Sequence, residues 1–294
     1  MTDYPFSFAI VMAADSGYAD LLKGLVASLR SLPEGKKAKL CLLDLGLAEK
    51  DRKELEGEFE MIVTPDWDIS FPGQATKPGW FKAMVSRPFV PKHFPGYDIY
   101  LWVDADAWVQ TWEAPDIYLR TAWSGKMAVT PEIDRCYKSH NKWQRPRWKT
   151  LTFKEFQKGY GIKVANKLGR FNVINSGVFA LRGDAPHWEV WANSLTTALK
   201  KTNGTLVEQT ALNHAIYTNQ LPVGLLPAWS NWVCVDAPPF FDEARQQFVE
   251  PEPPHHPLSI LHLLGPVKNE VFDIETMNGD RVSRTLHFTD RKSL

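Results

Sequence analysis

Two acidic residues separated by one residue stand directly after an apolar run. Asp104 and Asp106 flank Ala105, and the preceding residues 99–103 read Ile-Tyr-Leu-Trp-Val. Such a run predicts a buried strand, and open α/β sheets bind ligands at the carboxyl ends of their strands. Two carboxylates placed there repel each other unless a cation joins them, and their oxygens suit Mg²⁺ or Mn²⁺. The pair therefore predicts a divalent-metal site with positions left for phosphate oxygens; a pair of solvated turn acids is the alternative.

The elements that must position this pair begin with an alternation of strand and helix signals. Short apolar runs predict buried strands, and apolar residues at helical spacing predict the helices between them. The order is βαβαβ, the opening of a doubly wound sheet of parallel strands. The expected elements are a strand at 6–13, a helix that Asp15 and Ser16 can cap, a strand at 40–45, a helix at 49–59 and a strand at 60–64.

The rest of the chain continues this pattern and then departs from it. Asn278-Gly279 between two strand-like runs predicts a C-terminal hairpin. We expect a mixed, mainly parallel sheet with helices on both faces, formed by one domain at 1–268, and a hairpin extension at 269–294. The further elements are a helix at 82–94 interrupted near Pro88 and Pro91, strands at 99–103, 126–130, 178–181 and 259–264, helices at 188–200 and 207–217, and hairpin strands at 271–276 and 281–288.

The segment 132–170 breaks the α/β rhythm with basic and aromatic residues. It either forms an acceptor-side insertion that binds a sugar or a lipid phosphate, or is a solvated basic loop. Its characteristic residues are Lys138, Lys142, Trp143, Arg145, Arg147 and Trp148.

Composition excludes several classes of function. Lys+Arg and Asp+Glu both number 34, and a nucleic-acid binder normally carries a basic surplus, so we expect no nucleic-acid partner. No stretch approaches 18 apolar residues, which predicts no integral membrane segment. Three widely separated cysteines predict reduced thiols, and the N-terminus lacks a basic leader. Both features predict a cytoplasmic protein, which can also associate peripherally with the inner face of the membrane.

Five segments together resemble the family 8 glycosyltransferases, which include glycogenin and bacterial lipopolysaccharide galactosyl- and glucosyltransferases. They occur in the order of the family's own motifs and span roughly residues 6 to 268. The resemblance implies the GT-A nucleotide-diphospho-sugar transferase fold and a UDP-sugar donor. The segments are FAIVMAADSGYADLLKGLVASLR (8–30), KAMVSRPFVPKHFPGYDIYLWVDAD (82–106), FNVINSGVFALR (171–182), EQTALN (208–213) and HLLGPVK (262–268).

The resemblance implies a set of metal and donor ligands. Asp104, Asp106 and His262 would hold Mn²⁺ or Mg²⁺, which would neutralise the donor diphosphate as the leaving group. Lys268 would add a positive charge at the phosphates, and Gly265 would let the backbone approach them closely. Without the resemblance, His262 reads as a core histidine.

The same resemblance assigns the nucleoside end of the donor. Asp15 would accept from the uracil N–H and Tyr18 would stack on the base, with Ala13 beside them. Asp15 is equally an N-cap for the following helix, and the two roles do not exclude each other. The remaining donor contacts would come from Lys82, Arg87, Asp104 and Ala105.

At the transferred sugar, the resemblance implies a retaining reaction. Gln209 would lie behind the anomeric carbon, Asn175 beside the sugar, and Glu208 at its hydroxyls. Glu208 and Thr210 stand where the family usually has Asp, which leaves the donor sugar open. Asn269-Glu270 replaces the usual Pro-Trp after the final lysine, so the closing loop can be built differently.

Three other readings compete with a retaining transferase acting on a glycan or lipid-linked acceptor. A phosphatase of the haloacid dehalogenase type also places an Asp-x-Asp after a buried strand, but nearer the N-terminus and with a different residue after it. A non-catalytic nucleotide-sugar or glycan-binding module would keep the metal site and form no product. An inverting transferase would use a carboxylate base.

Overall fold

The computed structural model describes residues 4–137 and 150–288 of the 294-residue chain. Its centre is a seven-stranded sheet with the strand order β3-β2-β1-β4-β7-β6-β8. Among the described residues, four pairings of this sheet are parallel, and the two pairings of β7 are antiparallel. The predicted mixed, mainly parallel sheet is confirmed. Its strands are β1 (Phe8–Ala14), β2 (Lys39–Asp44), β3 (Met61–Val63), β4 (Ile99–Val103), β6 (Met127–Pro131), β7 (Ile174–Arg182) and β8 (Val223–Leu225).

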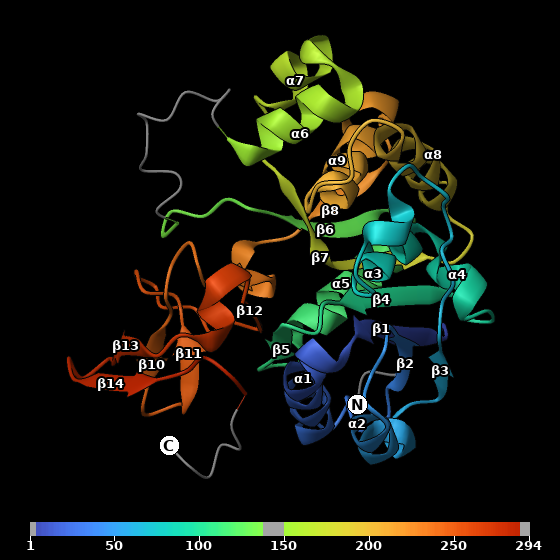
Figure 1. Ribbon diagram of the computed structural model, residues 1–294. Helices are drawn as coiled ribbons and strands as arrows, with labels where there is room; N and C mark the ends of the chain where they lie inside the picture. The colour runs from blue at the N-terminus through green and yellow to red at the C-terminus, as the bar shows by residue number, and fades with distance from the viewer. Residues whose placement is uncertain (1–3, 138–149, 289–294) are drawn as a thin grey trace.

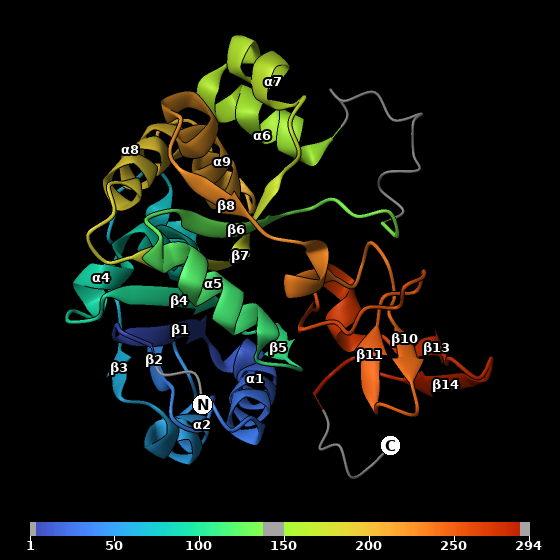
Figure 2. The same cartoon turned by 180° about the vertical axis from the view of Figure 1, so that it is seen from behind.

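Helices cover both faces of this sheet (Figure 1, Figure 2). In β1, Ala9 and Val11 face one apolar core, and Ile10 and Met12 face the other, as the alternation of side chains along a strand requires. The first core includes residues of α3 (Phe81–Ser86), α4 (Val90–His93), α8 (His187–Leu199) and α9 (Val207–Asn219). The second includes residues of α1 (Ala19–Ser31), α2 (Glu49–Leu55) and α5 (Glu113–Trp123).

The direction of β7 decides what lies beside the carboxyl end of β4. Because β7 is antiparallel to β4, with Val178 opposite Val103, its first residues lie next to the residues that follow β4. The backbone N–H of Asp104 donates to the carbonyl of Gly177 at 2.8 Å. Strand pairing thus places the start of β7 against the predicted metal site.

A second, small sheet brings the C-terminal part of the chain to the same place. β5 (Ala107–Val109) follows Asp106 directly and pairs antiparallel with β12 (Ile260–His262), so that His262 lies opposite Ala107. On its other side β12 pairs with β9 (Trp232–Val233). This sheet therefore carries His262 to the two acids.

The C-terminal hairpin packs beside this small sheet. β13 (Phe272–Glu275) and β14 (Arg281–Arg284) form the predicted hairpin, and β10 (Phe240–Asp242) pairs with β11 (Gln247–Val249). Figure 1 shows these strands together at one side of the main sheet. Trp108, Trp232, Phe248, Ile274 and Leu286 belong to one buried apolar cluster, so the hairpin shares a core with the small sheet.

The predicted elements are present in order through residue 64 and from β6 to the hairpin, but between α9 and β12 the structure adds β8, β9, β10 and β11, which the sequence did not predict. The interruption expected in the helix at 82–94 is confirmed as well, since a 3₁₀ turn, η4 (Arg87–Phe89), separates α3 from α4. In the segment 132–170, the structure adds α6 (Leu151–Tyr160) and α7 (Ile162–Leu168), which the sequence did not predict. The basic and aromatic cluster expected at 138–148 lies outside the described residues.

Two smaller expectations concern the membrane and the thiols. Within 4–137 and 150–288, every helix is too short or too polar to cross a bilayer. Cys41, Cys136 and Cys234 are buried and unpaired, as predicted.

Candidate active site

A pocket opens where β1, β2 and β4 end, the edge of the sheet at which such folds bind ligands. It contains about 510 Å³ of empty space. Most of the predicted nucleoside and metal ligands line it together with apolar residues. The lining residues are Ala13, Ala14, Asp15, Tyr18, Leu45, Trp80, Ala83, Met84, Arg87, Asp104, Ala105 and Asp106.

Asp104, Asp106 and His262 converge beside this pocket in an arrangement that fits a metal ion. One ligand atom of each lies within 4.8 Å of the others. His262 Nε2 is 3.3 Å from Asp106 Oδ1 and 4.0 Å from Asp104 Oδ2. The ring is fully buried, yet Nε2 makes no hydrogen bond to any residue that the structure describes. Buried polar atoms are normally paired, so a nitrogen left free between two carboxylates fits a metal ligand, and a donor set of two oxygens and one nitrogen suits Mn²⁺ better than Mg²⁺.

Asn231 orients the histidine. The Nδ1 of His262 lies 3.0 Å from Asn231 Oδ1, which can only accept, so Nδ1 carries the proton and the Nε2 lone pair is directed to the acids. Burial lowers the pKa of His262, but the nearby carboxylate of Asp106 and the charge of Asp104 raise it above its usual value. Burial raises the pKa of Asp106, but His262 and Lys268 hold it below its usual value. A metal ion therefore competes with a proton at the histidine.

Gly177 of β7 lies against two of these ligands. A Cβ at this position would be 2.3 Å from His262 Cε1 and 2.7 Å from Asp104 Oδ2. Its N–H donates to Asn175 Oδ1 at 2.8 Å, and the same oxygen accepts from Asn231 Nδ2 at 3.0 Å. Only glycine leaves room for the ring of His262 at this position. The hydrogen bond from Asn231 to Asn175 holds the side chain that orients His262.

Lys268 approaches the site from the turn after β12. It lies in the 3₁₀ turn η7 (Gly265–Asn269), which begins at a residue with a φ of +64°. Its ammonium donates to the Tyr18 hydroxyl, lies 4.2 Å from the centre of the Tyr18 ring and 3.3 Å from Asp106 Oδ2. Burial lowers the pKa of Lys268, but Tyr18 and Asp106 raise it above its ordinary value, so the side chain stays charged. Lys268 thus places a positive charge between Tyr18 of the pocket and Asp106 of the metal site.

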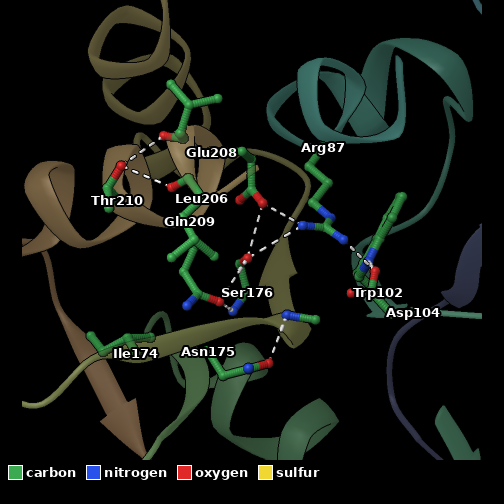
Figure 3. A network of polar contacts seen from close by, with 12 residues as sticks. Arg87, Trp102, Asp104, Ile174, Asn175, Ser176, Leu206, Glu208, Gln209 and Thr210 are labelled. Carbon is green, nitrogen blue, oxygen red and sulfur yellow. Dashed lines mark hydrogen bonds and ion pairs between the residues drawn. The ribbon is translucent and has the colours of Figure 1, made fainter. Parts of the chain in front are cut away.

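Arg87 is the centre of a buried ion-pair network (Figure 3). Its two terminal nitrogens donate to Glu208 Oε2 and to Asp104 Oδ1, and the guanidinium lies 5.1 Å from the centre of the Trp102 ring. Ser176 Oγ donates to the same oxygen of Glu208 at 2.9 Å. Burial raises the pKa of Glu208 despite the neighbouring Arg87. Nε of Arg87 and Oε1 of Glu208 are buried and without partners among the described residues, so one donor and one acceptor of this network are left unused.

Glu132 connects the two amides predicted at the transferred sugar. Its Oε1 accepts from Asn175 Nδ2 at 2.9 Å and from Gln209 Nε2 at 3.2 Å. The Oε1 of Gln209 accepts from the backbone N–H of Ser176 at 3.1 Å (Figure 3). Burial raises the pKa of Glu132, and the charge of Asp236 raises it further. The hydrogen bonds from Asn175 and Gln209 lower it, but the net pKa stays above the usual value. The amide of Gln209 is therefore held on both sides, and a carboxyl group lies next to it.

The structure brings most of the predicted site residues together but leaves two apart. Asp15 caps the 3₁₀ turn η1 (Ser16–Tyr18) by accepting from Gly17 N at 2.9 Å, so its N-cap role is confirmed and its uracil role stays a prediction. The ammonium of Lys82 donates to the Pro65 carbonyl at 3.0 Å and does not line the pocket. Gly265 is exposed at the start of η7. The donor roles of Lys82 and Gly265 stay predictions.

Sequence reasoning missed three residues of the site. Glu132 follows β6 as closely as Asp104 follows β4, and that position after an apolar run was the available signal. Asn231 carries no local signal, because only the tertiary fold places it beside His262. Trp80 lines the pocket and is 36% exposed, and as one of twelve tryptophans it did not stand out.

Comparisons with known proteins agree with this geometry. No protein-family model matches the sequence, and a comparison with curated proteins gives no significant match. Among solved structures, the galactosyltransferase LgtC in complex with donor and acceptor sugar analogues is similar with a TM-score of 0.54 and 14% identity, over 88% of each chain.

Two further transferases are similar over parts of longer chains. The glycosyltransferase GlyE of Streptococcus pneumoniae TIGR4 gives a TM-score of 0.53 at 16% identity, over 97% of this chain and 61% of that one. The bifunctional glycosyltransferase WbbM gives 0.51 at 14% identity, over 79% and 40%. At these identities the likeness establishes the fold, and the chain has the GT-A fold of glycosyltransferases.

Proposed function

We propose that the protein is a metal-dependent retaining glycosyltransferase of the family 8 type, which moves a hexose from a UDP-sugar to a glycan or lipid-linked acceptor. One observation carries the proposal: the free buried nitrogen of His262 faces Asp104 and Asp106 beside a pocket of a GT-A fold. A metal with open coordination positions at this place would bind a diphosphate that enters the pocket. The ammonium of Lys268, which lies 3.3 Å from Asp106 Oδ2, would add a second positive charge near the same diphosphate.

Each group of residues has a distinct task in this proposal. Asp104, Asp106 and His262 hold the metal, which when bound supplies positive charge to the leaving diphosphate. Asp15 and Tyr18 bind the uracil. The remaining groups act on the sugar: Arg87 and Glu208 bind its hydroxyls through their free buried atoms, and Asn175 and Gln209 lie beside the reacting carbon.

Four finer points belong to the same proposal: retention of configuration, Mn²⁺ as the metal, a domain at 1–268 followed by an extension at 269–294, and a cytoplasmic location with peripheral association at the inner face of the membrane. They rest on the sequence and its resemblance to the family, and the GT-A fold does not decide them.

The first test is ligand stabilisation. UDP and Mn²⁺ together are expected to stabilise the wild type more than either alone, because the metal and the diphosphate bind as a unit. At about 100 times the dissociation constant the gain is about 2.7 kcal/mol, which raises the melting temperature by roughly 5 to 10 °C for a chain of this size. Asp106→Ala is expected to remove the joint effect. Thermal unfolding of both proteins with each ligand checks this, and a wild type that responds to neither would refute the proposed site.

Glu132→Gln tests the sugar end of the site. The amide is nearly isosteric and keeps one acceptor for Asn175 and Gln209, so UDP binding with Mn²⁺ should be unchanged. Loss of the carboxyl group beside the reacting carbon is expected to lower kcat by about 100-fold or more. Turnover of a UDP-sugar panel measures this, with UDP affinity as the control. Unchanged turnover would assign Glu132 a structural role, and UDP binding without any product would favour the non-catalytic module.

A further inference from the structure

The chain returns after β14 to the turn that carries Asp104 and Asp106. Trp108 of β5 donates through Nε1 to the carbonyl of Leu286 at 2.8 Å, and Leu286 is fully buried. The ring of Phe288 lies 5.6 Å from that of Trp108. A segment far from the metal ligands in sequence is therefore fastened to the strand that directly follows them.

The same segment reaches the turn that bears Lys268. His287 Nε2 donates to the main-chain carbonyl of Lys268. His287 and Phe288 also line a cavity with about 340 Å³ of empty space together with Ala105 and Asp106. The residues at 286–288 thus contact β5, which directly follows the metal-binding turn, and η7.

The turn η7 is reinforced by this contact at its C-terminal half, beyond the constraint that Pro266 places on its start. It begins at the exposed Gly265, whose positive φ marks a residue with wide conformational freedom, and it lacks the Pro-Trp that the resembling family has after the lysine. A ligand-binding loop that is ordered in advance spares the ligand the entropy of ordering it. A hydrogen bond to the carbonyl of Lys268 holds the main chain of the very residue whose ammonium meets Asp106 and Tyr18.

We infer that residues 286–288, called the strap, hold Lys268 in place for the donor diphosphate and that His287 is a positioning residue of the donor site. The hairpin extension then contributes to donor binding, although none of its residues up to 288 lines the donor pocket. This inference rests on the proposed function.

A double-mutant cycle on UDP affinity in the presence of Mn²⁺ tests the strap. His287→Ala is expected to weaken UDP binding about three- to tenfold, the value of one lost hydrogen bond. Lys268→Ala is expected to weaken it further. If His287 acts through Lys268, the double variant binds UDP as weakly as Lys268→Ala alone, because contacts that share a partner are not additive.

Matched variants separate the hydrogen bond from packing. His287→Leu fills similar space without an N–H and should behave as His287→Ala, whereas His287→Gln keeps an amide donor and should restore most of the affinity. Val282→Ala, at an exposed position of the same hairpin, should bind UDP as the wild type does.

Two results would overturn the inference and leave the proposed function intact. One is wild-type affinity in both His287→Ala and His287→Leu. The other is an undiminished effect of His287→Ala in the Lys268→Ala background, which would mean general damage to the fold. If the wild-type protein itself binds no UDP with Mn²⁺, the proposed function fails and the strap loses its role with it.

Discussion

Gly177→Ala is expected to abolish Mn²⁺-dependent UDP binding while the chain still folds. The added Cβ would lie 2.3 Å from Cε1 of His262, whose ring is fully buried and cannot swing out to solvent. Either the ring or β7 must shift, and overpacking of this kind costs about 1–3 kcal/mol of stability. A displaced ring no longer directs Nε2 to the two acids, so the metal affinity falls much more than the stability does.

Titration calorimetry with Mn²⁺ and UDP measures this effect, and circular dichroism confirms the fold. Gly57→Ala is the matched control, because a Cβ there would meet no atom within 4 Å. Should Gly177→Ala bind UDP and Mn²⁺ with wild-type affinity, His262 would not be a ligand in the arrangement described.

Glu208→Gln is expected to lower the free energy of unfolding by about 3 kcal/mol or more, a large loss for a single polar substitution. The neutral amide leaves the buried Arg87 with Asp104 as its remaining anionic partner, and removing one member of a buried ion pair costs about 3 kcal/mol or more. For a chain of this size the melting temperature should fall by roughly 6 °C or more. Because the proposed function has Glu208 bind the sugar through Oε1, turnover should fall as well.

Unfolding in urea measures this loss, and an exposed pair supplies the control. Glu49 and Lys53 form a solvent-exposed ion pair on α2, and Glu49→Gln is expected to change stability by less than about 0.5 kcal/mol. Glu208→Asp keeps the charge on a shorter side chain and should lose less than Glu208→Gln. Equal stability of Glu208→Gln and the wild type would mean that Arg87 is compensated elsewhere.

The parts of the site that the sequence predicts from the residues alone are those that local order determines. Asp104 and Asp106 stand at the end of β4 because five apolar residues precede them, and no tertiary information is needed to see this. Asp15 follows β1 in the same way and is predicted as an N-cap, whereas the uracil roles of Asp15 and Tyr18 came from the resemblance. His262 is different, because its place depends on the pairing of β12 with β5, and only the resemblance to a family supplied it.

The direction of β7 could not be read from its residues, for a physical reason. Eight of the nine residues in Ile174–Arg182 are buried, and a strand covered on both faces shows the same pattern in either direction. Direction follows from the path of the preceding connection, which includes the segment at 132–170. The loop that holds Lys82 by the carbonyl of Pro65 is likewise set by packing that the sequence pattern does not show.

A local signal was overlooked in α5, whose apolar residues Ala114, Tyr118, Leu119 and Ala122 recur at helical spacing and face the second core. Glu132 lies at the junction of the strand β6 and the basic segment at 132–170, and its position directly after the strand is the local signal that marks it as a site residue.

The pairing of β12 with β5 also bears on how the molecule assembles. β1, β2 and β3 are joined by short connections and can form early, since contacts between residues near in sequence require little loop closure. Contact between Ala107 and His262 closes a loop of about half the chain, which slows its formation. We therefore expect the three proposed metal ligands to meet late in folding, after the main sheet exists. A newly made chain would then pass through a stage in which its nucleotide pocket is formed but these three side chains are not yet together.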